Sequence, residues 1–247
     1  MTAKAHVNRI RETAYTGETG RRRLQFCLDY TAYKKAALIE GEKLLWGGVA
    51  ANGEVISCKK GCAHCCRLYV MASLQEAESI AYYLYNKEAA LQHFLSAYGD
   101  WRKKLGEFER KMPRLEQLIV GNLTGSLSRE QEKDFDSYVH EYAGMQAPCP
   151  FVVDNSCSIY DVRPFACAAL VAVTPPETCV PDGSGRNRAD YRKIEVKIDE
   201  EMPYFLKSRN PILFGCLPGL VYRLLTQGYS FLEEIPGFEG LKYKDSV

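Results

Sequence analysis

Several hallmarks of common protein classes are missing from this chain of 247 residues. No stretch approaches the roughly 18 consecutive apolar residues of a membrane-spanning helix. The opening segment, MTAKAHVNRIRETAYTGETGRRR, carries basic residues but lacks the apolar core of a secretory signal. These absences predict no membrane partner and a cytoplasmic location, in a reducing compartment where stable disulfides are rare.

The charge balance and the motif content exclude further classes. Lys and Arg number 32 against 31 Asp and Glu, so the net charge of +1 gives no reason to expect nucleic acid or an acidic substrate. The basic run at Arg21–Arg23 is not accompanied by an aromatic-basic platform, so we expect no specific nucleic acid partner. Glycine-rich phosphate loops, H-E-x-x-H and G-x-S-x-G are also absent, and no catalytic residue can be named from such motifs.

Cysteine, in contrast, is abundant and clustered. Seven of the ten cysteines fall in two short segments, C-K-K-G-C-A-H-C-C and C-P-F-V-V-D-N-S-C-S-I-Y-D-V-R-P-F-A-C. Thiols this close together are stable as disulfides or as metal-bound thiolates, and a reducing compartment favours the metal. We therefore expect a metal centre held by cysteines of both segments. These cysteines are Cys58, Cys62, Cys65, Cys66, Cys149, Cys157 and Cys167.

The spacing of these cysteines favours a centre with more than one metal atom. Cys58, Cys62 and Cys65 share one face if their segment is helical, and the intervening glycine lets the chain turn if it is a loop. The side chain of Cys66 diverges from that of Cys65 in either regular structure, so the two thiols reach different metal atoms more easily. Seven thiolates, or eight with Cys179, exceed the four that bind one zinc or one cubane cluster. An iron–sulfur or iron centre is favoured, and zinc is the alternative.

The other candidate ligands are weaker. Cys27 and Cys216 lie in helical or apolar stretches, where a free cysteine usually packs as a small hydrophobe. Cys179 follows the second segment in a proline-rich loop, and is included as a ligand although core packing explains it equally well. His64 lies between cluster cysteines and is either a nitrogen ligand or a loop histidine beside the metal.

Tyr160 and Arg163 lie between two expected ligands, and we expect both to bind the cofactor. Thiolate clusters need hydrogen-bond donors and positive charge around their sulfur atoms. Arginine supplies several fixed donors and remains charged in proteins. Arg163 is therefore predicted to point toward the metal centre or its bound ligand, with a surface arginine that closes a turn as the alternative.

Hydrophobic periodicity predicts a mainly α fold with cysteine-rich loops and a minor β element. A helix is expected from about Arg22 to Trp46, ended by Gly47 and Gly48. Capping boxes predict helices over about 73–85 and 128–144, and apolar residues at helical spacing cover 91–108 until Pro113 ends the helix.

Short strands are expected at Val55–Ile56 and over 194–198, and a last helix from Pro218 to Gly228. Residues 1–20 are expected to be flexible. The remainder, 21–247, is predicted to form one domain with a helical insertion at about 74–144.

The two cysteine segments together carry a family resemblance. The pattern C-x3-C-x2-C-C, followed by C-P-F-x5-C-x-I-Y-x-x-R-P-x-x-C, resembles a bacterial and archaeal cysteine-cluster family described as zinc- or iron-chelating. The flagellin lysine N-methylases are grouped with that family. The resemblance implies metal or iron–sulfur binding by the matching cysteines. One position departs, because the family commonly has arginine after the last cysteine and this chain has Ala168.

Two functions follow from these features. In the first, an iron–sulfur centre binds S-adenosylmethionine and supports methyl transfer to a protein lysine, which makes a protein substrate the expected partner. The C-x3-C-x2-C spacing of radical S-adenosylmethionine enzymes supports it, although the chain lacks the strand–helix alternation of their barrel. In the second, zinc or iron is structural or carried, and the chain is not an enzyme. The oligomeric state cannot be read from the sequence.

Overall fold

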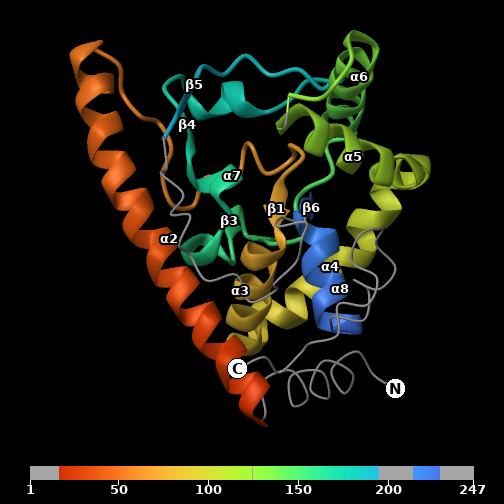
Figure 1. Ribbon diagram of the computed structural model, residues 1–247. Coiled ribbons are helices and arrows are strands. Elements are labelled where there is room, and N and C mark those ends of the chain that lie inside the picture. Colours follow the sequence, from red (N-terminus) through yellow and green to blue (C-terminus); the bar gives the residue numbers. More distant parts are fainter. Residues whose placement is uncertain (1–16, 124, 195–213, 229–247) are drawn as a thin grey trace.

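Helices dominate the computed structural model of the chain, and its strands are short and paired around the cysteine-bearing loops (Figure 1). The described residues are 17–123, 125–194 and 214–228. The predicted mainly α fold with a minor β element is confirmed. Within these ranges, no helix is both long enough and apolar enough to cross a membrane. The helices are α2 (Gly17–Ala51), α3 (Leu74–Tyr85), α4 (Glu88–Leu105), α5 (Met112–Leu123), α6 (Arg129–Gly144), α7 (Phe165–Ala168) and α8 (Leu217–Gln227), with 3-10 turns η1 (Gly106–Lys111), η2 (Tyr160–Val162) and η3 (Pro176–Cys179).

Helix α3 lies at the centre of the packing, with α2 against one side and α8 against another. Its start is fixed by the predicted capping box, in which the Ser73 hydroxyl accepts the Glu76 N–H at 3.2 Å and a Glu76 carboxylate oxygen accepts the Ser73 N–H at 2.9 Å. Ile80 and Leu84 are completely buried on its inner face. A second predicted capping box opens α6 at Ser128. Both helices begin directly after the predicted cap residues, because a capping box joins groups only three residues apart.

The apolar stripe of α4 is buried as predicted, but the helix ends earlier than expected. Gly106 stops α4 with a φ of +54°, a conformation that costs glycine little, and η1 carries the stripe on to the buried Phe108. The prediction that Pro113 breaks this helix is wrong. Pro113 instead lies in the first turn of α5, where its missing N–H needs no partner.

Helix α2 runs along one flank of the molecule, from α3 to the β4–β5 pair (Figure 1). The predicted stop at Gly47 and Gly48 is wrong, since the helix continues to Ala51 and buries Val49. An interior glycine costs a helix only about 1 kcal/mol, which the burial of one valine can offset. Gly53, with a φ of +69°, marks the actual end. Most of the segment 1–20, predicted to be flexible, lies outside the described residues.

In the part of the chain that the structure describes, three antiparallel strand pairs tie the loops to the helices. Strands β1 (Met71–Ser73) and β6 (Phe214–Cys216) join the starts of α3 and α8. Strands β2 (Val152–Val153) and β3 (Ser156–Cys157) form a hairpin, and β4 (Leu170–Ala172) pairs with β5 (Tyr191–Lys193).

Two expected strands are not seen as predicted. Val55 and Ile56 form no strand, because only the neighbouring Ser57 N–H bonds to β4, at 2.9 Å from the Ala172 oxygen. The strand expected over 194–198 lies outside the described residues except for the buried Ile194, which follows β5.

Candidate metal centre

Eight cysteines line one cavity of about 130 Å³. They come from five segments of the chain: the loop before β1, the turn after α6, β3, α7 and η3. All ten cysteines of the chain lie in the described ranges, and none forms a disulfide. The cavity cysteines are Cys58, Cys62, Cys65, Cys66, Cys149, Cys157, Cys167 and Cys179.

The other two cysteines lie elsewhere, in apolar packing. Cys27 is completely buried beside Phe26 and Tyr30, and Cys216 is 2 % exposed in the main core. The structure therefore separates the cysteines into the same two groups as the sequence does, with Cys179 in the cavity group.

The first cysteine segment is a chain of turns rather than a helix. The N–H groups of Cys62 and Cys66 bond to the carbonyls three residues earlier, at 3.2 and 3.1 Å. Gly61 has a φ of +89°, which few other residues adopt at low cost. Of the two conformations that the spacing allowed, the loop is the one observed.

Backbone and ring contacts bring the second segment to the first. The Cys149 N–H bonds to the Cys66 carbonyl at 2.7 Å. Phe151 stacks on Phe94 of α4 with 4.4 Å between ring centres, which anchors the β2–β3 hairpin to the core. These contacts place cysteines about 80 residues apart in the chain on one cavity wall.

Backbone N–H groups point at several of the sulfur atoms. The Cys58 sulfur accepts the Ala172 N–H at 3.1 Å, and the sulfurs of Cys149 and Cys157 accept N–H bonds two residues further along the chain. Burial nevertheless raises the pKa of Cys149 to about 12 and raises the pKa of Cys157. In the metal-free protein these thiols therefore keep their protons at neutral pH, and a metal must displace those protons when it binds.

Cys65 and Cys66 form a hydrogen-bonded pair. The Cys66 thiol donates to the Cys65 sulfur, which lowers the pKa of Cys65 and raises the pKa of Cys66. Both side chains line the cavity, although they are adjacent in sequence. This is possible because the segment is irregular, so the divergence expected in a helix or strand does not apply.

The cavity thiols are not gathered at a single point. Within the described ranges, no group of three or more His, Cys, Asp or Glu side chains is arranged closely enough to hold a metal ion. The donor chemistry fits zinc or iron, since the wall offers soft thiol ligands with N–H donors to their sulfurs.

Tyr160 and Arg163 also line the cavity. The guanidinium carbon of Arg163 lies 3.9 Å from the centre of the Tyr160 ring, so the aromatic face orients the arginine. Asp161 instead forms an exposed ion pair with Lys60 at 3.8 Å. Burial raises the pKa of Cys157 and Cys167, and the charge of Arg163 opposes both shifts.

His64 remains beside the cluster and not in the cavity wall. Its Nδ1 lies 3.4 Å from the Cys62 sulfur, and the residue is half-buried. The structure therefore places it next to a cavity cysteine without assigning it as a ligand.

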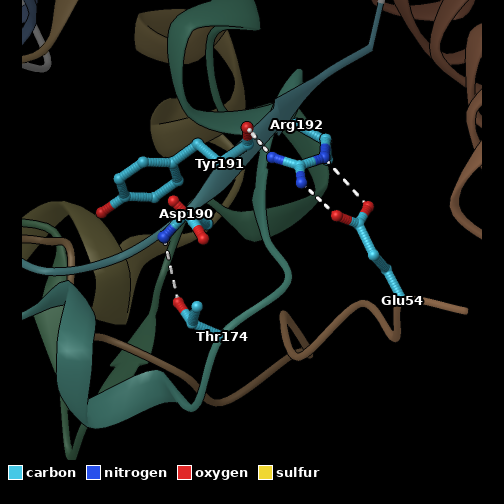
Figure 2. A network of polar contacts seen from close by, with 5 residues as sticks. All are labelled: Glu54, Thr174, Asp190, Tyr191 and Arg192. Carbon is cyan, nitrogen blue, oxygen red and sulfur yellow. Dashed lines mark hydrogen bonds and ion pairs between the residues drawn. The ribbon is translucent and has the colours of Figure 1, made fainter. Parts of the chain in front are cut away.

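Tyr191 is a cavity residue that the sequence analysis did not identify. Its hydroxyl hydrogen-bonds to the Cys179 thiol and accepts the Asn187 side-chain N–H at 3.2 Å. The neighbouring Arg192 forms an ion pair with Glu54, and the two side chains leave β5 on opposite sides (Figure 2). No cysteine motif includes Tyr191, and only the pairing of β5 with β4 brings it to the wall.

The network in Figure 2 fixes the position of β5 on both sides of Tyr191. Arg192 donates to the Tyr191 carbonyl at 3.0 Å and to Glu54 at 2.9 Å through its Nε. The Asp190 N–H bonds to the Thr174 hydroxyl at 3.1 Å. The Cys179 wall of the cavity is thereby tied to the loop that leads into the first cysteine segment.

Comparison with known proteins agrees with this geometry. The family model "CxxCxxCC: Putative zinc- or iron-chelating domain" matches residues 57–193, more than half of the chain. The chain belongs to this family. The matched range contains all eight cavity cysteines, and helices α2 and α8 lie outside it. No curated protein and no solved structure matches the chain. The match concerns zinc or iron chelation, and it does not extend to lysine methylation.

Proposed function

We propose that this chain binds a polynuclear, thiolate-ligated metal centre, iron or iron–sulfur in composition, inside the eight-cysteine cavity. The observation that carries the proposal is the shared cavity, which collects both cysteine segments and Cys179 from five parts of the fold. Backbone N–H bonds to sulfur and the nearby charge of Arg163 support it, because both stabilise thiolates. None of the ten cysteines forms a disulfide, which is consistent with the reducing cytoplasm that we propose as the location of the protein.

Electrostatic neighbours divide the cavity thiols into two groups, which supports a centre of more than one metal atom. Cys58, Cys62 and Cys179 influence one another on the side near β4. Cys66, Cys149, Cys157 and Cys167 form the second group, and Cys65 interacts with members of both. A bridging position for Cys65 would leave about four thiols for each side, the ligand number of a tetrahedral site.

The test is anaerobic purification followed by metal and sulfide analysis and an absorption spectrum. A cluster gives stoichiometric iron and sulfide with broad absorption in the visible range. Two metal atoms per chain without sulfide would retain the polynuclear centre and remove the cluster. A colourless protein with a single zinc would overturn the proposal and leave the structural zinc module.

A second candidate is S-adenosylmethionine-dependent methyl transfer to a protein lysine. The observation that favours it is Arg163, which has no carboxylate within ion-pair distance in the described ranges and is suited to hold a carboxylate of a ligand. The cavity volume argues against it, because about 130 Å³ is below the roughly 300–1,000 Å³ of sites for ligands of that size. Equilibrium dialysis of the metal-loaded protein with S-adenosylmethionine tests whether the chain binds this ligand; no binding would rule out the second candidate.

A further inference from the structure

Two buried charged side chains hold the short segment between Cys157 and Cys167. Lys34 of α2 donates from Nζ to the Val162 carbonyl at 2.8 Å and to the Arg163 carbonyl at 2.9 Å. Glu76 of α3 accepts the Phe165 N–H at 2.6 Å. The segment 162–165 is therefore fixed from outside, by two helices that are distant in sequence.

These contacts supply hydrogen-bond partners to a segment that does not pair with a strand. The Val162 N–H already bonds to Ile159 at 2.9 Å, and Pro164 has no N–H. Lys34 donates to the carbonyls of Val162 and Arg163, and Glu76 accepts the Phe165 N–H. The Lys34–Val162 contact is buried and the other two are part-buried, and a buried backbone group without a partner is costly, so removal of the Lys34 donors is expected to loosen the segment.

Burial of the two charged side chains costs free energy of desolvation, which their hydrogen bonds to the segment offset. Lys34 is 2 % exposed and Glu76 is 4 % exposed, and lysine and glutamate are seldom buried so fully unless they are paired. Burial lowers the pKa of Lys34 to about 8, and the charge of Glu76 opposes the shift. The Lys34 ammonium also lies 5.9 Å from the centre of the Phe165 ring.

We infer that Lys34 and Glu76 form a clamp that positions Arg163 and Cys167 at the metal centre. Helix α2, which lies outside the range matched by the family model, is then part of the functional unit. The role of the clamp toward a metal rests on the proposed function, whereas its hold on the segment 162–165 does not. Lys34 is a positioning residue, since it does not line the cavity and its hydrogen bonds go to the backbone of η2 and of Arg163.

The chain offers a matched control for a Lys34 variant. Arg23 of α2 donates from Nε to Glu78 of α3 at 3.0 Å, and both side chains are buried. This pair joins α2 to α3, and neither residue lines the cysteine cavity. Lys34→Met keeps the aliphatic stem and loses the donors, and Arg23→Met does the same at the control site. Glu76 is left unchanged because it also caps α3.

The experiment measures amide hydrogen exchange of the reduced, metal-free protein by mass spectrometry. Lys34→Met is expected to accelerate exchange in peptides covering 157–168 at least about tenfold, which corresponds to about 1.4 kcal/mol of lost protection. Arg23→Met is expected to leave these peptides unchanged, and Lys34→Arg to restore most of the protection. Equal acceleration by Lys34→Met and Arg23→Met, or none by Lys34→Met, would overturn the clamp. If Lys34→Met does not fold, Lys34→Gln, whose shorter, uncharged side chain keeps only part of the hydrogen bonding, takes its place. A smaller acceleration of the same peptides is then expected, and no acceleration would overturn the clamp.

Anaerobic titration with Zn²⁺ separates the clamp from the proposed function. If the parent protein binds the metal, Lys34→Met should bind it about 10–100-fold more weakly, the usual effect of losing support around ligands. Unchanged affinity in that variant would overturn the role of the clamp at the site. A parent protein that binds neither Zn²⁺ nor, in a parallel anaerobic titration, Fe²⁺ would overturn the proposed function, and exchange at 157–168 would still decide the clamp.

Discussion

The helical core and the cysteine region of this molecule are stabilised in different ways. In the helical core, formed by α3, α4, α5 and α8, apolar side chains such as Leu84, Leu115 and Leu225 are completely buried. The cysteine region, residues 57–68 and 149–179, consists mainly of turns and strands of two or three residues around a cavity. The first region can be stable through packing alone, whereas the second depends on long-range anchors and, we propose, on a metal.

The same residue type behaves differently in the two regions. Cys216 packs in the core, its N–H bonded to Glu116 at 2.8 Å, and it is 2 % exposed. Cys58 and Cys65 are exposed at the cavity wall. A cysteine in the core fills space as a small hydrophobe, and a cysteine at the cavity is available to a ligand.

The largest effect is expected from a change of one cavity cysteine. Cys157→Ser should weaken metal binding more than about 100-fold, beyond the 10–100-fold of supporting residues, because a direct ligand is lost. Stability should fall with it, since the free energy of metal binding is also free energy of folding. Metal analysis and thermal unfolding, with and without chelator, measure both.

Cys27→Ser is the control for that change, because Cys27 is buried away from the cavity. It should keep the metal content of the parent protein. Metal loss equal to that of Cys157→Ser would remove the distinction between the two groups of cysteines.

A substitution that removes apolar packing from the helical core should have the opposite effect, with a loss of stability and no loss of metal affinity. Leu225→Ala, at a completely buried position of α8, should lower the free energy of unfolding by about 2–5 kcal/mol. The affinity for metal should stay within about twofold of the parent, because distant sites are usually additive. Denaturant unfolding and metal titration of the same variant test this; a parallel loss of affinity would show that the two regions are coupled.

Alkaline pH should destabilise the metal-free protein through the cysteine region. The folded pKa of Cys149 is raised by burial to about 12 from 9.0, so between these values the folded state holds a proton that the unfolded state has lost. This group's contribution to stability is therefore complete below about pH 9. At 1.36 kcal/mol per pKa unit, roughly 1.4 kcal/mol of it is lost by pH 10 and on the order of 4 kcal/mol above about pH 12. Urea unfolding at about pH 7 and about pH 10 measures it.

The metal-loaded protein should lose less stability over the same range, because metal-bound thiolates have no proton to lose. Equal losses with and without metal would indicate that the tyrosines of the core, such as Tyr98, dominate the titration, since burial raises the pKa of Tyr98 as well.

The smallest effect is expected from Arg163→Ala. Loss of this charge beside Cys157 and Cys167 should weaken metal binding about tenfold, or shift the reduction potential of an iron centre, with the fold intact. Lys59→Ala removes an exposed charge next to Cys58 and should change neither quantity. If Arg163→Ala keeps the metal affinity and the reduction potential of the parent, Arg163 serves only to form the turn.

Local signals in the sequence were sufficient for much of the helical core. The capping boxes at Ser73 and Ser128 involve groups three residues apart, so they fix helix starts wherever the helix packs. The stops at Gly47, Gly48 and Pro113 were wrong because glycine is a weak helix breaker and proline is compatible with a first turn.

By itself, the sequence singled out the seven cysteines of its two segments as candidate ligands, because their spacing and flanking residues carry the pattern of the family that matches 57–193. Only the tertiary structure decided that Cys179 and Tyr191 share the cavity wall, and that Lys34 and Glu76 hold its backbone. The physical reason is distance along the chain. Lys34 meets Val162 across 128 residues, and no local propensity encodes a hydrogen bond between groups so far apart.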